Sequence, residues 1–296
     1  MIDIKHIMNN VVNNPDTVVF LNEREAAACL YRAKSLLKKE KAFIEIDEKV
    51  VFVGDTHGDF ETTKSVIKNF FDKNCLVFLG DYIDREPFRW GAIYNIIYLL
   101  ILKCCYPNKI YLLKGNHECN YIIPCYPYEL ENEIIQKYGS SSLHKKIVDV
   151  FKAMPLMLSS KNVFAAHGGI LKEANIEKLK KVSKNDIKSI ESIVWSDPEI
   201  SPIARGIGDC FNEKDLNRFL KYINANVFIR GHDYNLNGFS IYNDKCLTIF
   251  SSRRYKNMGN NGILVAKAEK KISRVKDLIV KDFSSGHWKK YKVGRI

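Results

Sequence analysis

The sequence predicts an α/β fold in which two packed sheets are flanked by helices and a polar site lies on one rim. Two observations predict this architecture. Short apolar runs rich in β-branched residues alternate with longer segments of helical periodicity, a pattern typical of α/β proteins. Each apolar run also ends abruptly at a glycine or a polar side chain, and the functional residues of such folds gather outside the carboxyl ends of the strands. No repeat, low-complexity block or linker divides the chain, so we expect one domain.

The predicted strands deliver chemically useful residues to one edge of the fold. The five runs, with the polar residue that follows each, are Val50–Val53 (Asp55), Leu76–Leu79 (Asp81), Ile110–Leu113 (Asn116), Val163–Ala166 (His167) and Val227–Ile229 (His232). Further strands are expected at 246–250 and 262–267.

Helical periodicity accounts for the longer segments. Apolar residues recur at helical spacing over 21–41, 61–72, 90–105, 128–138, 142–153 and 213–223. The last of these helices is expected to begin after Asn212, because an asparagine side chain can accept a hydrogen bond from a backbone N–H group of the first helical turn. The second half of the chain, 155–296, is richer in predicted strand.

The composition is that of an ordinary globular protein with a basic balance. Apolar residues make up 46% and charged residues 27% of the 296 residues, which argues against a disordered chain. The 46 Lys and Arg exceed the 34 Asp and Glu, for a formal net charge of +12. Such a charge favours anionic partners, among them phosphorylated proteins, nucleotides, nucleic acid and acidic membranes. Because the charge is spread along the chain, it does not choose among them.

Cysteine usage and the N-terminal sequence favour a cytoplasmic protein. The eight cysteines are scattered without a Cys-x-x-Cys pair, which is typical of buried thiols in a reducing compartment. Residues 1–14 lack the apolar run of a signal peptide. The longest apolar stretch, Ala92–Leu102, is too short to span a bilayer, so no membrane partner is expected.

The residues at the strand ends are ligands that divalent metals prefer. Two carboxylates, three imidazoles and one amide suit borderline ions such as Mn²⁺, Fe²⁺ or Zn²⁺. The candidate ligands are Asp55, His57, Asp81, Asn116, His167 and His232. Six exceed what one tetrahedral site needs, whereas a shared carboxylate lets six side chains serve two ions. Two ions about 3.5–4 Å apart can clamp a phosphoryl group and generate hydroxide from a bridging water.

The alternative is a set of buried histidines with purely structural roles. Taken alone, an Asp-x-His or Asn-His pair is weak support for a metal site, because short motifs recur by chance. Four of the seven histidines, however, lie beside or within the strand-end motifs, which structural packing does not explain. Glycines adjoin these motifs and are expected to keep side chains clear of the ions.

Three motifs, in this order, resemble the signature of the calcineurin-like metallophosphoesterases. They read Gly-Asp-Thr-His-Gly at 54–58, Gly-Asp-Tyr-Ile-Asp-Arg at 80–85 and Gly-Asn-His-Glu at 115–118. His-Gly-Gly at 167–169, Trp-Ser-Asp-Pro at 195–198 and Arg-Gly at 205–206 are similar to the serine/threonine phosphoprotein phosphatases, the family of the type-1, type-2A and calcineurin enzymes. The resemblance implies one phosphatase catalytic domain over 1–296, built on a two-sheet β-sandwich. It covers about residues 20–268 and leaves 269–296 as an unassigned extension.

The resemblance implies a role for each candidate ligand. One ion would be held by Asp55, His57 and a bridging Asp81, and the other by Asp81, Asn116, His167 and His232. Asn116 would also contact the substrate.

The resemblance further implies which groups act on the phosphoester. Arg85 and Arg205 would grip the phosphate oxygens, and a guanidinium fork matches phosphate geometry. His117 would be the general acid that protonates the departing serine or threonine oxygen, with Asp84 orienting its ring. Tyr255 would overhang the site.

Structural alternatives exist for several of these residues. From the sequence alone, Arg205 fits a surface-loop arginine, and His117 could instead ligate a metal. Tyr255 and Tyr126, the latter matching an aromatic residue beside the phosphate pocket, could be packing aromatics.

Several positions depart from the family pattern. Glu86 replaces a glycine after the second motif, and Gly231 and Asp233 replace alanine and glutamine around the last histidine ligand. Arg-Arg at 253–254 stands where an Ala-Pro-Asn stretch is usual, and Lys256 replaces a cysteine. These departures point away from the contacts that eukaryotic members make with inhibitors and regulatory subunits, so no regulatory subunit is assigned, and they favour the prokaryotic branch.

The sequence therefore predicts a metal-dependent serine/threonine protein phosphatase that hydrolyses phosphomonoesters of phosphorylated proteins by direct attack of a metal-bridging hydroxide. A nucleotide hydrolase of the diadenosine tetraphosphate type is disfavoured, because those enzymes begin at the first metal motif and read Gly-Asn-His-Asp, whereas about 50 residues precede the motif here and the last motif ends in Glu118. A nuclease or phosphodiesterase, and with it a nucleic acid partner, is disfavoured because Tyr234 stands where that branch has a further histidine ligand. A non-enzymatic basic binding module is disfavoured because the ligands, His117 and both arginines are intact.

Overall fold

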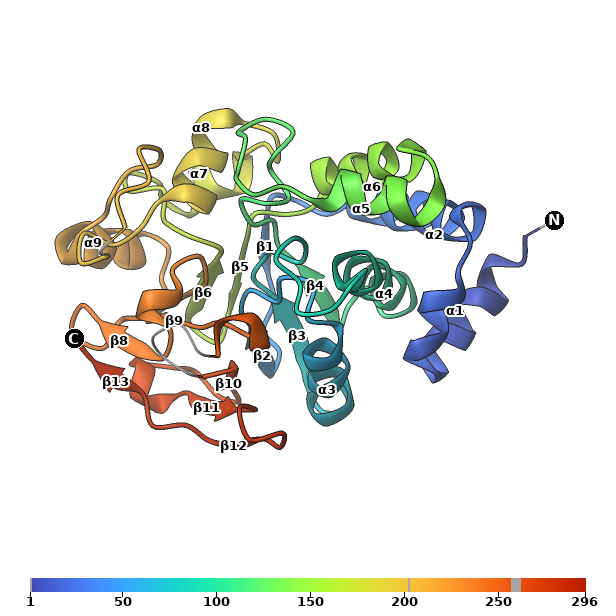
Figure 1. The fold of residues 1–296 in the computed structure, drawn as a ribbon. Coiled ribbons are helices and arrows are strands. Elements are labelled where there is room, and N and C mark those ends of the chain that lie inside the picture. The colour runs from blue at the N-terminus through green and yellow to red at the C-terminus, as the bar shows by residue number, and fades with distance from the viewer. Residues whose placement is uncertain (1, 202, 257–261) are drawn as a thin grey trace.

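The computed structural model describes residues 2–201, 203–256 and 262–296, and within them two β-sheets pack face to face. Helices cover the outer faces of the sheets, with α4 (Gly91–Cys105) in the group on one side and α9 (Glu213–Tyr222) in the group on the other (Figure 1). The predicted fold, an α/β protein with two sheets flanked by helices, is confirmed.

Within the described residues, one sheet has seven strands and the other has six. The seven-stranded sheet has the order β1 (Phe43–Glu45), β5 (Met157–Ser160), β6 (Val163–Ala166), β7 (Val227–Arg230), β9 (Cys246–Thr248), β8 (Phe239–Ile241) and β13 (Gly294–Arg295). The six-stranded sheet has the order β12 (Lys289–Lys290), β11 (Ile279–Asp282), β10 (Leu264–Ala268), β2 (Val50–Val53), β3 (Cys75–Phe78) and β4 (Ile110–Leu112).

The predicted apolar runs are continuous because their strands are buried on both faces. In β2, Val50 and Phe52 belong to the core between the two sheets, whereas Val51 and Val53 belong to the core beneath the helices. All four side chains are buried. A strand with one face in solvent would instead alternate apolar and polar residues.

The helices form two groups, one on each outer face (Figure 1). The group with α4 also contains α1 (Ile4–Asn13), α2 (Glu23–Leu37), α3 (Phe60–Phe70), α5 (Leu130–Tyr138) and α6 (Ser142–Ala153), and the group with α9 contains α7 (Ile176–Lys181) and α8 (Ile187–Ile190). Short helical turns lie at Pro15–Phe20, Glu191–Trp195, Tyr234–Leu236, Arg253–Tyr255 and Val275–Asp277.

The six predicted helices are present, with their ends shifted by a few residues. The predicted N-cap is also confirmed, because Asn212 Oδ1 accepts a hydrogen bond from Asp215 N at 3.0 Å. The sequence did not predict α1, α7 and α8. The first contains three asparagines, which are poor helix formers, and packs against α2 and α4, while the other two are too short to show a helical period.

The carboxyl ends of the strands meet at one rim of the sandwich, as predicted. β2, β3 and β4 are parallel neighbours, so the loops that follow them emerge together. β6, β7 and β9 are parallel in the other sheet, and a parallel bridge between Asp55 and Phe250 joins the two edges. Residues after strands of both sheets therefore meet at this rim.

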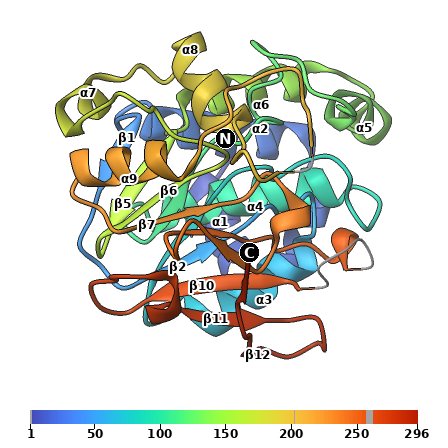
Figure 2. The same cartoon turned by 90° about the vertical axis from the view of Figure 1, so that its left-hand side faces the viewer.

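The C-terminal extension, 269–296, adds strands to both sheets. β11 pairs with β10 and β12 with β11, while β13 pairs with β8 in the other sheet. Figure 2 shows β10, β11 and β12 side by side at the end of the molecule opposite α7 and α8. The division of the chain into one domain stays a prediction. Across the described ranges, no helix combines the length and the hydropathy needed to cross a membrane.

Candidate active site

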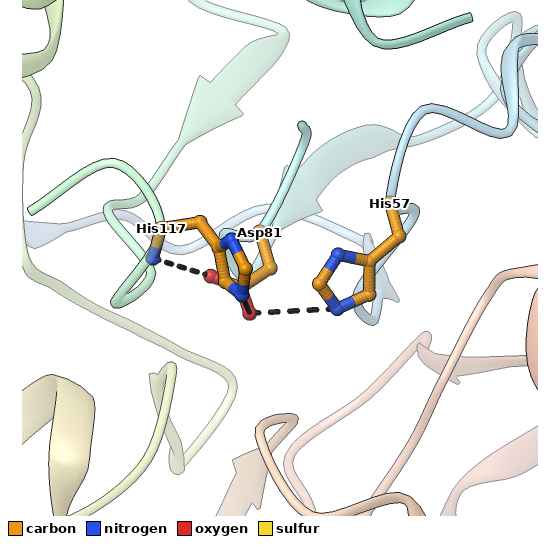
Figure 3. Close-up of side chains that lie close together, drawn as sticks. All are labelled: His57, Asp81 and His117. Carbon is orange, nitrogen blue, oxygen red and sulfur yellow. Dashed lines mark hydrogen bonds and ion pairs between the residues drawn. The ribbon is translucent and has the colours of Figure 1, made fainter. Parts of the chain in front are cut away.

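The structure brings the six candidate ligands into one buried cluster at the rim. Asp81 lies at its centre: Oδ2 is 3.6 Å from His57 Nε2 and 3.5 Å from His167 Nε2. Figure 3 shows this carboxylate next to the ring of His117, with its Oδ2 facing the ring of His57. The remaining ligands flank these atoms, with Asp55 Oδ2 4.0 Å from His57 Nε2, and Asn116 Oδ1 3.0 Å from His167 Nε2 and 3.1 Å from His232 Nδ1.

Hydrogen bonds orient the imidazole rings so that their lone pairs face the cluster. Nδ1 of His57 lies 3.0 Å from the carbonyl oxygen of Ile83, and Nδ1 of His167 lies 3.2 Å from that of Leu79. A carbonyl only accepts, so each Nδ1 carries the proton and each Nε2 presents a lone pair. Metal–ligand bonds of ~2.0–2.2 Å would place neighbouring donor atoms at about the separations seen here.

The electrostatics of the cluster also fit a cation. Burial raises the pKa of Asp55 and Asp81 well above the usual range of a carboxyl group. Burial lowers the pKa of His57, His167 and His232 well below that of free histidine. Ligands must be deprotonated carboxylates and neutral imidazoles, and a divalent cation among them would stabilise both forms.

Two glycines make room for the ligand carboxylates. A Cβ atom on Gly115 would lie 2.2 Å from Asp81 Oδ1, and one on Gly231 would lie 1.9 Å from Asp55 Oδ1. Backbone strain accompanies this crowding. Positive φ angles between 40° and 70° occur at five candidate site residues, namely His57, Asp81, Asp84, Arg85 and His232. Strain of this kind clusters at functional sites, where the surrounding structure holds it.

His117 lies beside the ligand cluster and is held by Asp84. Its Nδ1 is 2.5 Å from Asp84 Oδ2, while Asp84 Oδ1 accepts hydrogen bonds from the backbone N–H groups of Glu129 and Leu130. Burial raises the pKa of Asp84 to about 6. The Nε2 atom of His117 is buried and has no hydrogen-bond partner among the described residues, so it is available to a bound molecule.

The two candidate phosphate-binding arginines contact other residues of the site. Burial lowers the pKa of the His117 imidazole, and the charges of Arg85 and Arg205 lower it further. Arg85 Nη1 donates to the hydroxyl of Tyr255 at 3.0 Å, and Arg205 Nη2 donates to the carbonyl of His232 at 3.0 Å.

The tyrosines differ in their placement. Tyr255 is buried, and its ring centroid lies 5.5 Å from that of His57. The side chain of Tyr126 is 92% exposed, and the contact with Arg85 comes from its backbone carbonyl, 3.3 Å from Nη2. Its ring is therefore not packed into the protein.

Glu118 holds two loops of the site together, a role that was not predicted from the sequence. Its Oε2 accepts hydrogen bonds from the N–H groups of Asp81 and Gly115, and its Oε1 accepts one from Tyr82. One buried carboxylate thus ties the loop after β3 to the loop after β4, and burial raises its pKa to about 8. Its place directly after His117 was the available signal.

Arg230 is a second residue that the sequence reading missed. Its side chain is fully buried, donates to the carbonyl of Gly168, and pairs with Asp197, which also pairs with Arg205. Asp197 therefore links a strand end to the candidate phosphate ligand. An arginine at the end of an apolar strand, just before Gly231, was the signal.

Comparison with known proteins establishes the class. Residues 48–235 match the calcineurin-like phosphoesterase family, so the chain belongs to this family, and the predicted resemblance is confirmed. Membership and the buried donor cluster together indicate a divalent metal site.

Within this family, the chain is similar to serine/threonine phosphatases. It is 27% identical over 245 residues to the serine/threonine-protein phosphatase 4 catalytic subunit of Kluyveromyces lactis, covering 75% of each chain. The subunit of the same name from Saccharomyces cerevisiae is 26% identical over 261 residues, covering 83% of this chain and 82% of its own. These relatives are eukaryotic, and the prokaryotic branch stays a prediction.

Solved structures support the fold. A protein serine/threonine phosphatase from S. cerevisiae, with similarity to human phosphatase PP5, superposes with a TM-score of 0.77 at 24% identity over 93% of this chain and 94% of its own. A cold-active protein-tyrosine phosphatase from a psychrophilic Shewanella species superposes with a TM-score of 0.62 at 17% identity over 87% and 84%.

Proposed function

We propose that the protein is a metal-dependent serine/threonine protein phosphatase that hydrolyses phosphomonoesters of phosphorylated proteins. The observation that carries this proposal is the buried ligand cluster centred on Asp81, beside which His117 Nε2 has no hydrogen-bond partner among the described residues. The names of the relatives, serine/threonine phosphatases at 26–27% identity, support the choice of substrate.

Two divalent ions, of Mn, Fe or Zn, complete the proposed site. Asp55, His57 and Asp81 would hold one ion, and Asp81 with Asn116, His167 and His232 the other. Such ions act as Lewis acids on the phosphoryl group and on the attacking water. The oxygen and nitrogen donors of the cluster suit these metals.

The remaining groups act on the substrate directly. Arg85 and Arg205 bind the phosphate oxygens, and Asn116 contacts the substrate next to its metal. Tyr255 holds Arg85 by the hydrogen bond to its hydroxyl and covers the site. His117 Nε2 donates a proton to the departing seryl or threonyl oxygen, while Asp84 holds Nδ1 and stabilises the charged ring.

Tyr234, the residue that disfavours a phosphodiesterase, packs against another tyrosine of the site. Tyr234, at the position where that branch has a further histidine ligand, stacks on Tyr255 with ring centroids 5.3 Å apart. The cytoplasmic location stays a prediction.

A metal-linked kinetic experiment tests the proposal. Asp81→Asn should lose metal and reduce phosphoserine-peptide hydrolysis by more than ~10²-fold, since disturbing even an outer partner of a metal ligand costs ~10–100-fold. The measurements are metal content by mass spectrometry and kcat/KM for phosphoserine, phosphothreonine and phosphotyrosine peptides, diadenosine tetraphosphate and single-stranded DNA. The control, Asp72→Asn, alters an exposed aspartate in the turn that follows α3. Full metal content and activity in Asp81→Asn, or a preference for a nucleotide substrate, would overturn the proposal.

A further inference from the structure

A groove of about 690 Å³ lies between α3 and the turn that follows β11. Among the described residues, four cationic side chains line it, namely Lys64, Lys68, Arg253 and Lys256, and one acidic side chain, Glu61. We call it the α3 groove.

The C-terminal extension builds one wall of the α3 groove and anchors it to α3. The ring of Trp288 stacks on Phe283 with centroids 5.0 Å apart and meets Phe70 of α3 edge to face at 4.9 Å. Trp288 Nε1 also donates to Ser65 Oγ at 3.0 Å. The hairpin of β11 and β12 therefore stands against α3, and the groove is formed before any ligand arrives (Figure 1).

One short turn joins the α3 groove to the candidate active site. Arg253 and Tyr255 belong to the same helical turn, Arg253–Tyr255. Arg253 lines the groove and pairs with Asp59, the N-cap of α3 and the second residue after His57. Tyr255 packs against His57 and bonds Arg85. The α3 groove and the candidate active site are therefore lined by residues of the same turn.

The charge of the groove favours an acidic segment. Lys64 is paired with Asp16 and Glu61, and Arg253 with Asp59, but none of the ion pairs of the described residues involves the exposed side chain of Lys68. The extension, 269–296, carries nine Lys and Arg against three Asp and Glu, half of the net charge of the whole chain. Its field adds to that of the lining lysines.

The aromatic wall disfavours nucleic acid as the occupant. Proteins that hold single strands present aromatic faces on which bases stack. In the α3 groove, Trp288 and Phe283 already stack on each other, and Trp288 also contacts Phe70.

We propose that the α3 groove binds an acidic segment of the phosphoprotein substrate, beside the phosphorylated residue, so that the enzyme prefers phosphosites with acidic flanks. The inference rests on the proposed phosphatase function and deepens it. Complementary charge raises the rate of encounter and fixes the register of the bound chain.

Matched phosphopeptides test the proposal. Phosphoserine peptides with a glutamate cluster on one side or the other are compared with glutamine counterparts, which keep the shape and remove the charge. We expect the wild-type kcat/KM to favour a glutamate peptide by roughly 3- to 10-fold, the size typical of one or two exposed ion pairs, mainly through KM and less at high salt. Lys68→Glu should abolish this preference and leave p-nitrophenyl phosphate hydrolysis unchanged. The control Lys73→Glu makes the same charge change at an exposed lysine outside the groove.

Two kinetic outcomes would overturn the groove assignment. One is equal kcat/KM for the glutamate and glutamine peptides, and the other is an equal effect of Lys68→Glu and Lys73→Glu. In both, continued hydrolysis of the glutamine peptide keeps the phosphatase proposal, so the two failures are distinct. Binding gives a readout without catalysis: a fluorescent glutamate peptide lacking phosphate should bind the wild type more tightly than Lys68→Glu. Equally strong competition by an oligonucleotide or by anionic vesicles would instead identify a general anion surface and overturn the proposal.

Discussion

The position of His117 depends on hydrogen bonds to two carboxylates. His117 is held by Asp84 at Nδ1 and by its own backbone N–H, which donates to Asp81 Oδ1 at 3.1 Å. The same carboxylate therefore lies at the centre of the candidate ligand cluster and positions the loop that carries the candidate acid. This coupling means that a test of His117 must separate proton donation from metal binding.

Leaving-group dependence separates the two roles. A seryl oxygen is a poor leaving group and needs protonation, whereas p-nitrophenolate is a stable anion. We expect His117→Asn to lower kcat for a phosphoserine peptide by about 10²–10⁴-fold and kcat for p-nitrophenyl phosphate far less, with metal content retained. Asp84→Asn should show the same asymmetry more mildly, because it disturbs the orientation and charge of the ring. Equal losses on both substrates would show that His117 supports the metal site instead.

At the scale of elements, one lysine side chain caps the C-terminal ends of two helices. Lys184 Nζ donates to the carbonyl oxygens of Leu37 and Ala153, the last residues of α2 and α6. A cation is favourable at a helix C-terminus, where carbonyl groups lack partners. Burial nevertheless lowers the pKa of Lys184 from its usual 10.5 to about 8.

This lowered pKa predicts a pH dependence of stability. Between about pH 8 and 10.5 the folded chain binds fewer protons at Lys184 than the unfolded chain, so the contribution of this residue to the free energy of unfolding rises with pH. We expect the wild type to gain stability relative to Lys184→Met between pH 7.5 and pH 10, as measured by urea denaturation with metal present. Lys188→Met, at an exposed lysine in α8, is the control and should show no such trend. A constant difference between the wild type and Lys184→Met would contradict the expectation.

At the scale of the whole molecule, the extension is part of the sandwich. Ile272, Val275, Leu278 and Val280 are buried in the core between the sheets, and β11 covers the edge of β10. Burying an aliphatic side chain contributes ~1.5–3 kcal/mol, so these four together approach the ~5–15 kcal/mol by which a whole domain is stable.

Truncation measures this contribution. Removal of 269–296 should leave the chain largely unfolded or aggregated, as followed by circular dichroism and size-exclusion chromatography. Removal of 294–296 alone takes away the pairing of β13 with β8 and the ion pair of Arg295 with Asp244, and should leave a folded protein with a modestly lower Tm. A wild-type Tm for the chain that ends at residue 268 would show that the extension is an appendage.

Seven strands, the longer helices and the candidate ligands could be predicted from the amino-acid sequence alone; the strands are β2, β3, β4, β6, β7, β9 and β10. Continuous apolar runs marked strands buried on both faces, and each polar residue directly after such a run had to emerge at a carboxyl end. These are local features, and short-range sterics and burial decide them. Asn212 was predictable for the same reason, since a cap bonds its own first helical turn.

The contacts that hold these ligands, and the surfaces around them, could not be predicted without the three-dimensional structure. Nothing near Glu118 in the sequence shows that it receives N–H groups from two separate loops, and nothing near Arg230 shows that it reaches Asp197. The strands of the extension depend on partner strands that are distant in the sequence. The wall that Trp288 forms against α3 depends on Ser65, which lies more than 200 residues earlier in the chain. Such contacts follow from how the two sheets pack, because buried polar groups take whatever partner the packing provides, however distant it is along the chain.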